Sequence, residues 1–301
     1  MKMNHKKTVF CAILGIPNVG KSTLINRLVA AKIAITTPKP QTTRTRIMGV
    51  ITVENTQYVF LDTPGINLER NKLGTYMQQE IVGAVEAIDV VLFTVYPKES
   101  FNDDEKKLLD ELFRKNTKVI LVMNKSDIVS SRAKGNAMLE KLCQEYQFSA
   151  SFMVSALTGE SIEPLMKEVA KYATIENFMY EEDTLTDIPE KIIVAELIRE
   201  RLIMNLSDEL PYGVAVAIES FKERTDSDII DIDATILCEK QSHKGIIIGK
   251  SGKMLKKIAS EARASIEEFL DTRVNLKCFV KVKDGWRDND QYIKDYNYLR
   301  R

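Results

Sequence analysis

The sequence predicts a mixed α/β protein, with a mostly parallel, doubly wound sheet in its first part and a smaller α+β part after it. Apolar strand segments alternate with amphipathic helices up to about residue 173, which is the pattern of a parallel sheet. The alternation then gives way to paired strands and longer helices. A chain of 301 residues also favours two domains by length alone.

The first part contains apolar strand segments, most of them followed by loops and by helices with apolar residues three or four positions apart. Asn102 or Asp103 is placed to cap one helix, because short polar side chains accept hydrogen bonds from the first backbone N–H groups. Residues 54–56 form the expected turn between the second and third strands. The expected strands cover residues 8–14, 47–53, 58–61, 89–95, 118–123 and 151–154, and the expected helices cover residues around 24–28, 74–88, 103–115, 134–146 and 162–172.

A polar, acidic stretch separates the two parts. Residues 1–173 form the expected first domain, residues 174–190 a linker and residues 191–301 the second domain. The second domain is expected to hold, in order, a helix over 190–206, strands over 214–221 and 229–238, a helical turn, a glycine loop, a helix over 253–270, a strand over 275–282 and a polar terminal helix.

The composition excludes several classes of protein. Apolar residues make up 44% and charged residues 29%, as in globular proteins, and no run approaches the ~18 apolar residues of a membrane span. The first residues lack the apolar core of a signal peptide, so we expect a cytoplasmic protein. A zinc site and a His-based triad are disfavoured, because there are two histidines and no C-x-x-C pair among the four cysteines, Cys11, Cys143, Cys238 and Cys278.

Basic residues are concentrated near the C-terminus, although the net charge of the chain is zero. Residues 240–301 carry 15 Lys and Arg against 8 Asp and Glu, whereas residues 1–239 carry 28 against 35. This asymmetry favours an anionic partner for the second domain. Charges clustered by chance on a solvated face are the alternative that composition leaves open.

A glycine-rich loop follows the first strand and opens the first helix. Residues 15–22 are Gly-Ile-Pro-Asn-Val-Gly-Lys-Ser, which match the phosphate-loop pattern G-x-x-x-x-G-K-[ST]. The glycines let backbone N–H groups turn toward phosphate oxygens, and the helix N-terminus adds its positive dipole end. Lys21 supplies a charge for the β- and γ-phosphates, and Ser22 supplies a hydroxyl for Mg²⁺.

Further motifs follow later strands of the same sheet. Asp62-Thr63-Pro64-Gly65 places a carboxylate for Mg²⁺ and a backbone N–H for a γ-phosphate. In the segment Asn124-Lys125-Ser126-Asp127, the Asp127 carboxylate can accept hydrogen bonds from both the N1–H and the exocyclic amine of guanine. Asn124 is expected to hold neighbouring loops together, and the stem of the Lys125 side chain is expected to cover one face of the base. Ser155-Ala156-Leu157 offers a backbone N–H to the guanine O6. Each motif is weak alone, but their order after a phosphate loop predicts GTP binding.

With this motif set, the first part resembles the G domain of translation-factor-class GTPases. The phosphate loop and the stretch Gln41-Thr42-Thr43-Arg44-Thr45-Arg46 resemble the Era family in particular. The resemblance implies Mg²⁺-dependent hydrolysis of GTP to GDP at a slow intrinsic rate, with Thr42 or, as favoured, Thr43 as a metal ligand. The implied catalytic residues are Lys21, Thr43 and Gly65, the metal ligands are Ser22, Thr43 and Asp62, and the nucleotide-binding residues are Gly15, Asn18, Val19, Gly20, Lys21, Ser22, Thr23, Asp62, Gly65, Asn124, Lys125, Asp127, Ser155, Ala156 and Leu157.

Three features bear on the hydrolysis step. Ile66 follows the Asp62 motif, where Ras-like enzymes carry a Gln that orients the attacking water. Because Ile66 cannot form a hydrogen bond to a water molecule, the attacking water must be oriented by the backbone, by another residue or by a partner. Arg44 and Arg46 are candidates for a charge near the phosphates, but a positioning or solvated role is favoured. Asn18 has two interpretations, a ligand of K⁺ beside the phosphates, as in related GTPases, or a residue that stabilises the loop.

A second glycine loop, Gly249-Lys250-Ser251-Gly252, lies in the basic region between two helical segments. A G-x-x-G loop lets a nucleic-acid backbone approach closely, and its lysines contact phosphates. The order of elements and the stretches 243–252 and 280–287 resemble the type II KH domain of the Era family. The resemblance implies an apolar groove for unpaired bases along residues 246–248 and Leu255, and an RNA-binding set of Ile246, Ile247, Gly249, Lys250, Ser251, Gly252 and Lys253.

The same resemblance implies a monomer that binds the 3′ end region of 16S rRNA, acts in assembly and maturation of the 30S ribosomal subunit, and associates peripherally with the inner face of the cell membrane. Trp286, the single tryptophan, either stacks on a base or, as favoured, packs the last helix against the sheet.

Two other functions agree less well with the sequence. The G-x-x-G loop disfavours a signalling GTPase that binds anionic lipid, and Asn124–Asp127 disfavour a metabolic NTP-dependent kinase.

Overall fold

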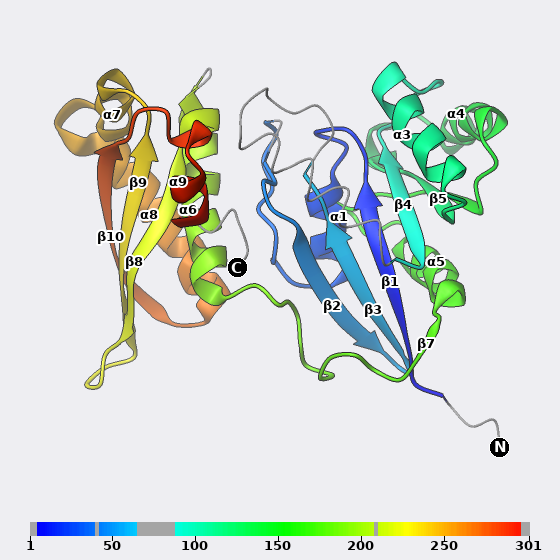
Figure 1. Ribbon diagram of the computed structural model, residues 1–301, viewed down its shortest axis with the longest axis horizontal. Coiled ribbons are helices and arrows are strands. Elements are labelled where there is room, and N and C mark those ends of the chain that lie inside the picture. The colour runs from blue at the N-terminus through cyan, green and yellow to red at the C-terminus, as the bar shows by residue number, and fades with distance from the viewer. Residues whose placement is uncertain (1–4, 40–41, 65–87, 208–209, 296–301) are drawn as a thin grey trace. The chain divides into compact units, whose positions relative to one another are not determined.

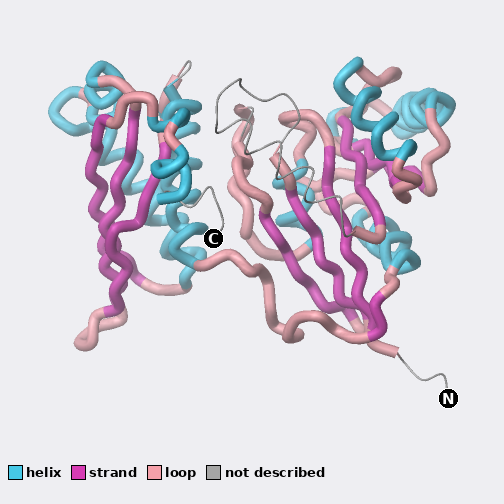
Figure 2. The backbone as a smooth tube through the Cα atoms, viewed as in Figure 1, coloured by secondary structure: helices cyan, strands magenta, loops and turns pink. Residues whose placement is uncertain are grey.

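The computed structural model describes residues 5–39, 42–64, 88–207 and 210–295. Apart from the segment of residues 37–42, the described chain up to Asp187 forms one compact unit, and the chain from Ile188 onward forms another. Each unit has its own sheet (Figure 2). The predicted α/β class, with an α+β part after the mostly parallel sheet, is confirmed.

The first unit is built on a mostly parallel sheet (Figure 1). Over the described residues it has seven strands, in the order β2-β3-β1-β4-β5-β6, with β7 beside β1. β2 and β7 run antiparallel to their neighbours and the other pairs are parallel. The strands are β1 (Lys7–Leu14), β2 (Ile47–Val53), β3 (Thr56–Asp62), β4 (Val90–Val95), β5 (Val119–Met123), β6 (Ala150–Met153) and β7 (Ile175–Glu176).

Helices cover the sheet, which explains why its central strands are mostly apolar and are buried along most of their length. α1 (Lys21–Leu28) packs on β1, β2 and β3. α3 (Asp103–Arg114) and α4 (Arg132–Glu145) bury leucines in a core with residues of β1, β4 and β5. α5 (Ile162–Val169) ends in a 3₁₀ turn over Ala170–Tyr172. The helix predicted over residues 74–88 lies outside the described residues, except for residue 88.

Asn102, and not Asp103, caps α3. Its Oδ1 accepts a hydrogen bond from the Glu105 N–H at 2.9 Å, and Glu105 Oε2 accepts from the Asn102 N–H at 2.9 Å. This reciprocal pair satisfies two N–H groups that the helix itself leaves unpaired. Glu105 is fully buried and also pairs with Lys98.

Most of the predicted linker is bound to the first sheet. β7 pairs with β1, the Val50 N–H donates to the Leu185 carbonyl at 2.8 Å, and Gln57 Oε1 accepts from the backbone N–H groups of Met179 and Tyr180. The first unit accordingly extends to Asp187. The sequence pattern missed this because a two-residue strand has no periodicity to detect.

The second unit is a three-stranded sheet in the order β10-β9-β8 over the described residues. β8 is antiparallel to β9 and contains a bulge near Glu219, whereas β10 is parallel to β9. α6 and α8 pack on the sheet. The elements are α6 (Glu190–Asn205), β8 (Ala215–Glu223), β9 (Ile229–Cys238), α7 (Gln241–Ile248), α8 (Lys253–Leu270), β10 (Arg273–Val282) and α9 (Asp290–Asp295).

Trp286 has a structural role in this unit. Its side chain is fully buried, and its Nε1–H donates to the Gly213 carbonyl at 3.0 Å. This burial favours the packing interpretation, because the ring is not available to stack on a base. All four cysteines are free.

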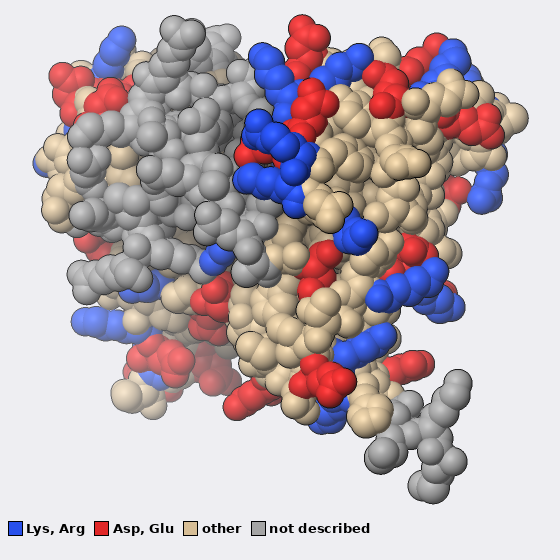
Figure 3. Space-filling view, turned by 45° about the vertical axis from the view of Figure 1, so that its right-hand side comes forward, with Lys and Arg blue, Asp and Glu red and all other residues tan. Residues whose placement is uncertain are grey.

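The surface carries charges of both signs. On the face shown in Figure 3, Lys and Arg side chains lie among Asp and Glu side chains, with broad uncharged areas between them. No helix in the described ranges combines the length and apolar character needed to span a bilayer.

The reciprocal cap of α3 predicts a stability effect. We expect Asn102→Ala to lower the free energy of unfolding of the first unit by about 1 kcal/mol, because the Glu105 N–H loses its acceptor. Ser131→Ala is the control, because Ser131 caps α4 through one exposed bond of 3.3 Å and should cost less. Hydrogen exchange of α3 and β4 amides in increasing urea measures both, and equal effects would contradict the expectation.

Candidate functional site

The loops that follow β1, β3, β5 and β6 come together at the carboxyl edge of the first sheet. β1 is the strand at which the order reverses, since β3 and β2 lie on one side of it and β4 lies on the other. Open α/β sheets bind ligands at such a switch point. The structure brings residues 15–22, Asp62, residues 124–127 and residues 155–157 to this edge, as the sequence predicts.

The phosphate loop needs glycine at both of its ends. Gly15 and Gly20 have φ angles of 153° and 93°, which residues with a Cβ atom rarely adopt. A Cβ on Gly15 would lie 2.2 Å from the Thr94 carbonyl oxygen, and one on Gly20 would lie 2.4 Å from Asn124 Nδ2. Both glycines therefore let the loop pack directly against the ends of β4 and β5.

Lys21 folds back over the loop that precedes it. Its Nζ donates to the carbonyl oxygens of Gly15 at 3.0 Å and Ile16 at 3.1 Å, and the residue is buried. Burial lowers the pKa of Lys21 to about 8, although the nearby Asp62 carboxylate acts in the opposite direction. A buried ammonium group held by carbonyls alone is suited to receive an anion such as a phosphate.

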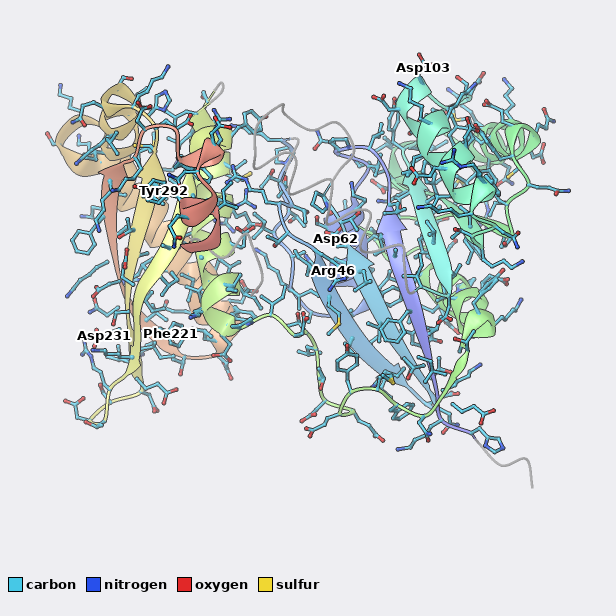
Figure 4. The ribbon with its side chains drawn as sticks, viewed as in Figure 1. Arg46, Asp62, Asp103, Phe221, Asp231 and Tyr292 are labelled. Carbon is cyan, nitrogen blue, oxygen red and sulfur yellow. The ribbon has the colours of Figure 1, made fainter. Side chains whose placement is uncertain are left out.

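Ser22, Thr43 and Asp62 converge beside Lys21. The Ser22 Oγ lies 2.8 Å from both Thr43 Oγ1 and Asp62 Oδ2, and Thr43 Oγ1 lies 3.4 Å from Asp62 Oδ2. Asp62 is fully buried, which raises the pKa of its carboxyl to about 6, while Lys21 acts to lower it. Figure 4 labels Asp62 at the end of β3.

The other carboxylate oxygen of this cluster, Asp62 Oδ1, is buried without a hydrogen-bond partner in the described part of the chain. An orphaned carboxylate oxygen beside two hydroxyls is a donor set that fits Mg²⁺, which prefers hard oxygen ligands. Thr42 does not join the set, because its Oγ1 lies 2.8 Å from Thr37 Oγ1 and donates to the Lys39 carbonyl at 2.9 Å. The geometry therefore favours Thr43, as the sequence analysis does.

Asn124 connects the phosphate loop to the loop after β6. Its Nδ2 donates to the Val19 carbonyl at 2.9 Å, and its Oδ1 accepts from the Ala156 N–H at 3.0 Å. The predicted role of holding neighbouring loops together is confirmed by these contacts. Lys125 Nζ donates to the Asn18 carbonyl at 2.7 Å, so its stem lies along the phosphate loop.

Asp127 is exposed at this edge and has one oriented oxygen. Its Oδ1 accepts from Ser155 Oγ at 2.6 Å, which couples the loop after β5 to the loop after β6. Ser155 Oγ also accepts from the Thr158 N–H at 3.1 Å. The Leu157 side chain is 69% exposed beside it. An exposed carboxylate fixed in this way can accept from two adjacent donors on a ligand.

Two positioning residues were missed by the sequence analysis. Arg27, on α1, donates through Nε to the Ala156 carbonyl at 2.9 Å and through Nη2 to the Leu157 carbonyl. Glu160 accepts from Ser126 Oγ at 2.6 Å, and its carbonyl accepts from the Ser155 N–H. Arg27 thereby ties the loop after β6 to α1, and Glu160 ties it to the loop after β5. No local pattern marks them, because Arg27 is 129 residues from its first partner.

The structure also bears on the remaining predicted residues of the first unit. Arg44 is only 4% exposed, so the solvated interpretation is wrong for this residue. Val19 is fully buried, so only its backbone can face a ligand. Asn18 is exposed with φ 66°. Gly65 and Ile66 lie outside the described residues.

In the second unit, the G-x-x-G loop lies between α7 and α8. Gly249 and Gly252 have φ angles of 71° and 76°, and a Cβ on Gly249 would lie 2.7 Å from the Met254 Cβ. The loop ends at the N-terminus of the 18-residue helix α8, whose dipole favours negative charge. Lys250 and Lys253 are both exposed there. Close backbone approach, two cations and a helix N-terminus together suit a phosphate backbone.

A groove with a volume of about 670 Å³ lies beside this loop. We call it the β10 groove. Lys244, Ile248 and Leu255 line it from the helices, and Asp233, Phe279 and Lys281 line it from the sheet. The groove has an apolar centre with charged residues of both signs around it.

The predicted apolar wall of residues 246–248 is only partly correct. Ile247 is fully buried in the core, so its side chain cannot contact RNA. Ile246 is 55% exposed and lines a different groove, with His243 and Met254. The reason is helical geometry, since successive side chains on α7 are rotated by about 100° and cannot share one face. Of the three, Ile248 lines the β10 groove.

Comparison with known proteins agrees with both sites. A family model described as a 50S ribosome-binding GTPase matches residues 10–125, and a KH domain model matches residues 209–287. GTPase Era of Caldanaerobacter subterraneus is 44% identical over 289 residues, which cover 96% of this chain and 97% of that protein. GTPase Era of Ruminiclostridium cellulolyticum is 44% identical over 292 residues, with 97% of each chain covered.

Solved structures agree over the same extent. A variant of Aquifex aeolicus Era bound to GDP·AlF4⁻ has a TM-score of 0.92 at 33% identity, covering 97% of this chain and 99% of that one. Era in complex with MgGDPNP and nucleotides 1506–1542 of 16S ribosomal RNA has a TM-score of 0.93 at 33% identity, covering 98% and 99%. This chain, a nucleotide-binding domain followed by a KH domain, therefore belongs to the Era family of GTPases.

Proposed function

We propose that this GTPase is a molecular switch that binds the 3′ end region of 16S rRNA through its KH domain and acts in assembly and maturation of the 30S subunit. One observation carries the proposal, namely that a single chain holds a convergent phosphate and guanine site and an exposed, basic G-x-x-G loop beside a groove. The Era structure with MgGDPNP and nucleotides 1506–1542 of 16S rRNA, similar along nearly the whole chain, supports it.

In this proposal the phosphate loop surrounds the phosphates of GTP or GDP with backbone N–H groups. Lys21 leaves the carbonyls of Gly15 and Ile16 and pairs with the β- and γ-phosphates, which restores a full counter-charge to its buried ammonium group. Ser22, Thr43 and Asp62 hold Mg²⁺, which when bound neutralises charge on the phosphates. Thr43 couples the γ-phosphate to the segment around it, so that hydrolysis releases this segment.

Guanine specificity rests on Asp127, whose carboxylate accepts from N1–H and the exocyclic amine. Ser155 holds one oxygen of that carboxylate in place, and the backbone of residues 155–157 faces the O6. The Lys125 stem covers the base. Hydrogen bonds of Asn124, Arg27 and Glu160 link these loops to one another and to α1, which reduces the ordering cost of nucleotide binding.

Hydrolysis is slow in this proposal because Ile66 cannot orient the attacking water. Lys21, Thr43 and the Gly65 N–H remain the groups that contact the reacting phosphate. Asn18, exposed at the phosphate loop, is proposed to bind K⁺, which would add positive charge beside the phosphates. Protein that is bound to RNA would hydrolyse GTP faster if the KH domain and the nucleotide site are coupled.

The first prediction concerns the base. Asp127→Asn should lower GTP affinity about 100-fold or more and favour xanthosine triphosphate, because an amide cannot accept from both guanine donors but can donate to the xanthine oxygen. Competition with a fluorescent nucleotide measures this. Asp103→Asn, the same charge change at an exposed residue in the first turn of α3 (Figure 4), should leave both affinities unchanged. Unaltered GTP affinity in the Asp127 variant would refute the site assignment.

The second prediction concerns turnover. GTP hydrolysis by the full chain should be severalfold faster in K⁺ than in Na⁺, and faster again with an RNA fragment from the 16S rRNA 3′ end. Phosphate release under each condition measures both effects. Equal rates in K⁺ and Na⁺ would leave Asn18 with the loop-stabilising role. A flat response to bound RNA would mean that RNA anchors the protein and that another component activates it.

The third prediction concerns the KH domain. Gly252→Asp should weaken RNA binding at least about tenfold and leave GTP affinity intact, since it places a carboxylate where phosphates approach. Gly285→Asp is a matched control, because Gly285 also has positive φ (58°) and open space at its Cβ position but lies outside the loop. Fluorescence anisotropy with a labelled RNA measures binding. Equal loss in both variants would indicate a folding defect instead.

A further inference from the structure

We propose that the β10 groove recognises base identity: Phe279 stacks on an unpaired base and Asp233 accepts a hydrogen bond from the exocyclic amine of that base, so that cytosine is preferred to uracil. This inference rests on the proposed RNA-binding function and adds a specificity to it. It assigns base recognition to side chains on the open face of the sheet, apart from the G-x-x-G loop.

Phe279 and Asp233 lie on the same face of adjacent strands. β10 and β9 are parallel, with Phe279 opposite Thr235 and Lys277 opposite Asp233. Because side chains alternate along a strand, residues 277 and 279 on β10 share a face with residues 233 and 235 on β9. Both Phe279 and Asp233 line the groove, together with Ile248 and Leu255 from the helices. A base that enters the groove therefore meets an aromatic ring and a carboxylate from the same sheet.

The charges of the two walls differ in a way that orients a nucleic acid. The helix side contributes Lys244, and the adjacent loop contributes exposed Lys250 and Lys253. The sheet side contributes two carboxylates, Glu219 and Asp233, besides Lys281. Carboxylates repel phosphate, so the RNA backbone runs along the helix side and the base edges face the sheet. The same pair of carboxylates disfavours an acidic peptide as the occupant.

The Asp233 carboxylate has no hydrogen bond or ion pair within the residues that the structure describes, although the residue is half-buried. Asp231, two residues earlier on the same face, is fully engaged. It pairs with Arg224 at 2.7 and 2.8 Å and accepts from Asn275 Nδ2 at 2.6 Å, and these partners hold its pKa well below the usual range. Figure 4 labels Asp231 near the hairpin end of the sheet, away from α7. Of these two aspartates on β9, Asp233 is thus the one whose carboxylate can accept from a ligand in the groove.

Phe279 is a large apolar side chain left 54% exposed on an edge strand. Exposed Lys277 and Lys281 flank it on the same face. An exposed aromatic ring is a surface on which single-stranded nucleic acids stack, since every base offers a flat face. Stacking would also remove this apolar surface from water.

The carboxylate decides which base is accepted. Cytosine presents its N4 amine, a donor that a carboxylate accepts, whereas uracil presents the O4 acceptor at the same place. Uracil would leave Asp233 desolvated and facing another acceptor. We therefore expect about tenfold tighter binding of cytosine than of uracil at this subsite, the effect of one good specific contact.

The experiment compares labelled oligocytidine and oligouridine of about eight nucleotides, long enough to fill a KH site. Anisotropy titrations use the full chain. Wild type should bind the cytidine probe about tenfold more tightly, and Asp233→Asn should bring the ratio close to one, since an amide can serve both bases. Asp228→Asn, the same charge change in the exposed β8–β9 hairpin, should keep the wild-type ratio.

Phe279 is tested by the same titrations. Phe279→Leu should weaken both probes about tenfold and keep their ratio, because stacking does not depend on base identity, and Phe279→Tyr should restore binding. Unchanged thermal unfolding of each variant shows that the fold is intact. If both probes bind and Gly252→Asp abolishes binding, but the ratio is one or survives Asp233→Asn, this inference is wrong and RNA binding stands. If neither probe nor the 3′-end fragment binds wild type, the proposed function itself fails.

Discussion

Two buried charges at the carboxyl edge of the first sheet, Lys21 and Asp62, are the constraint around which the nucleotide site is built. Burial shifts their pKa values toward the neutral forms, with Lys21 near 8 and Asp62 near 6. Lys21 is held by carbonyls and Asp62 by hydroxyls, and Asp62 Oδ1 has no partner in the described chain. Burial of charge is costly unless opposite charge is supplied, and a phosphate with a magnesium ion supplies both signs at once.

The surrounding loops hold this arrangement in place before a nucleotide arrives. Asn124 joins the phosphate loop to the loop after β6. Arg27 of α1 holds the latter loop, and Glu160 within it accepts from Ser126 in the loop after β5. The side chains of Asn124 and Arg27 bind backbone groups of these loops, and Glu160 accepts from the Ser126 hydroxyl. Such pre-organisation leaves less conformational entropy to be lost on binding. The same close packing requires glycine at positions 15 and 20, because a Cβ at either position would collide with Thr94 or Asn124.

The second unit separates backbone contacts from base contacts. The positive φ angles of Gly249 and Gly252 form a turn that ends at the N-terminus of α8, where cations and the helix dipole favour phosphate. The sheet opposite carries an exposed aromatic ring and carboxylates, which favour bases. Phosphate contacts position a nucleic acid and base contacts specify it. In the proposed complex with RNA, the loop would therefore contact phosphates and the sheet would contact bases.

The sequence by itself determined the fold class, the order of the elements and the motifs of both sites. Motif residues are recognisable because phosphate and guanine recognition need fixed residue types at short spacings, and α8 was predicted with its observed limits because its apolar period is regular over 18 residues. Tertiary structure alone decided which of residues 246–248 faces the groove, how Trp286 is used, and that residues 174–187 pack on the first sheet. It also revealed that Arg27 and Glu160 position the loop after β6. These features depend on contacts between residues far apart in the chain, and such contacts leave no local periodicity or spacing in the sequence.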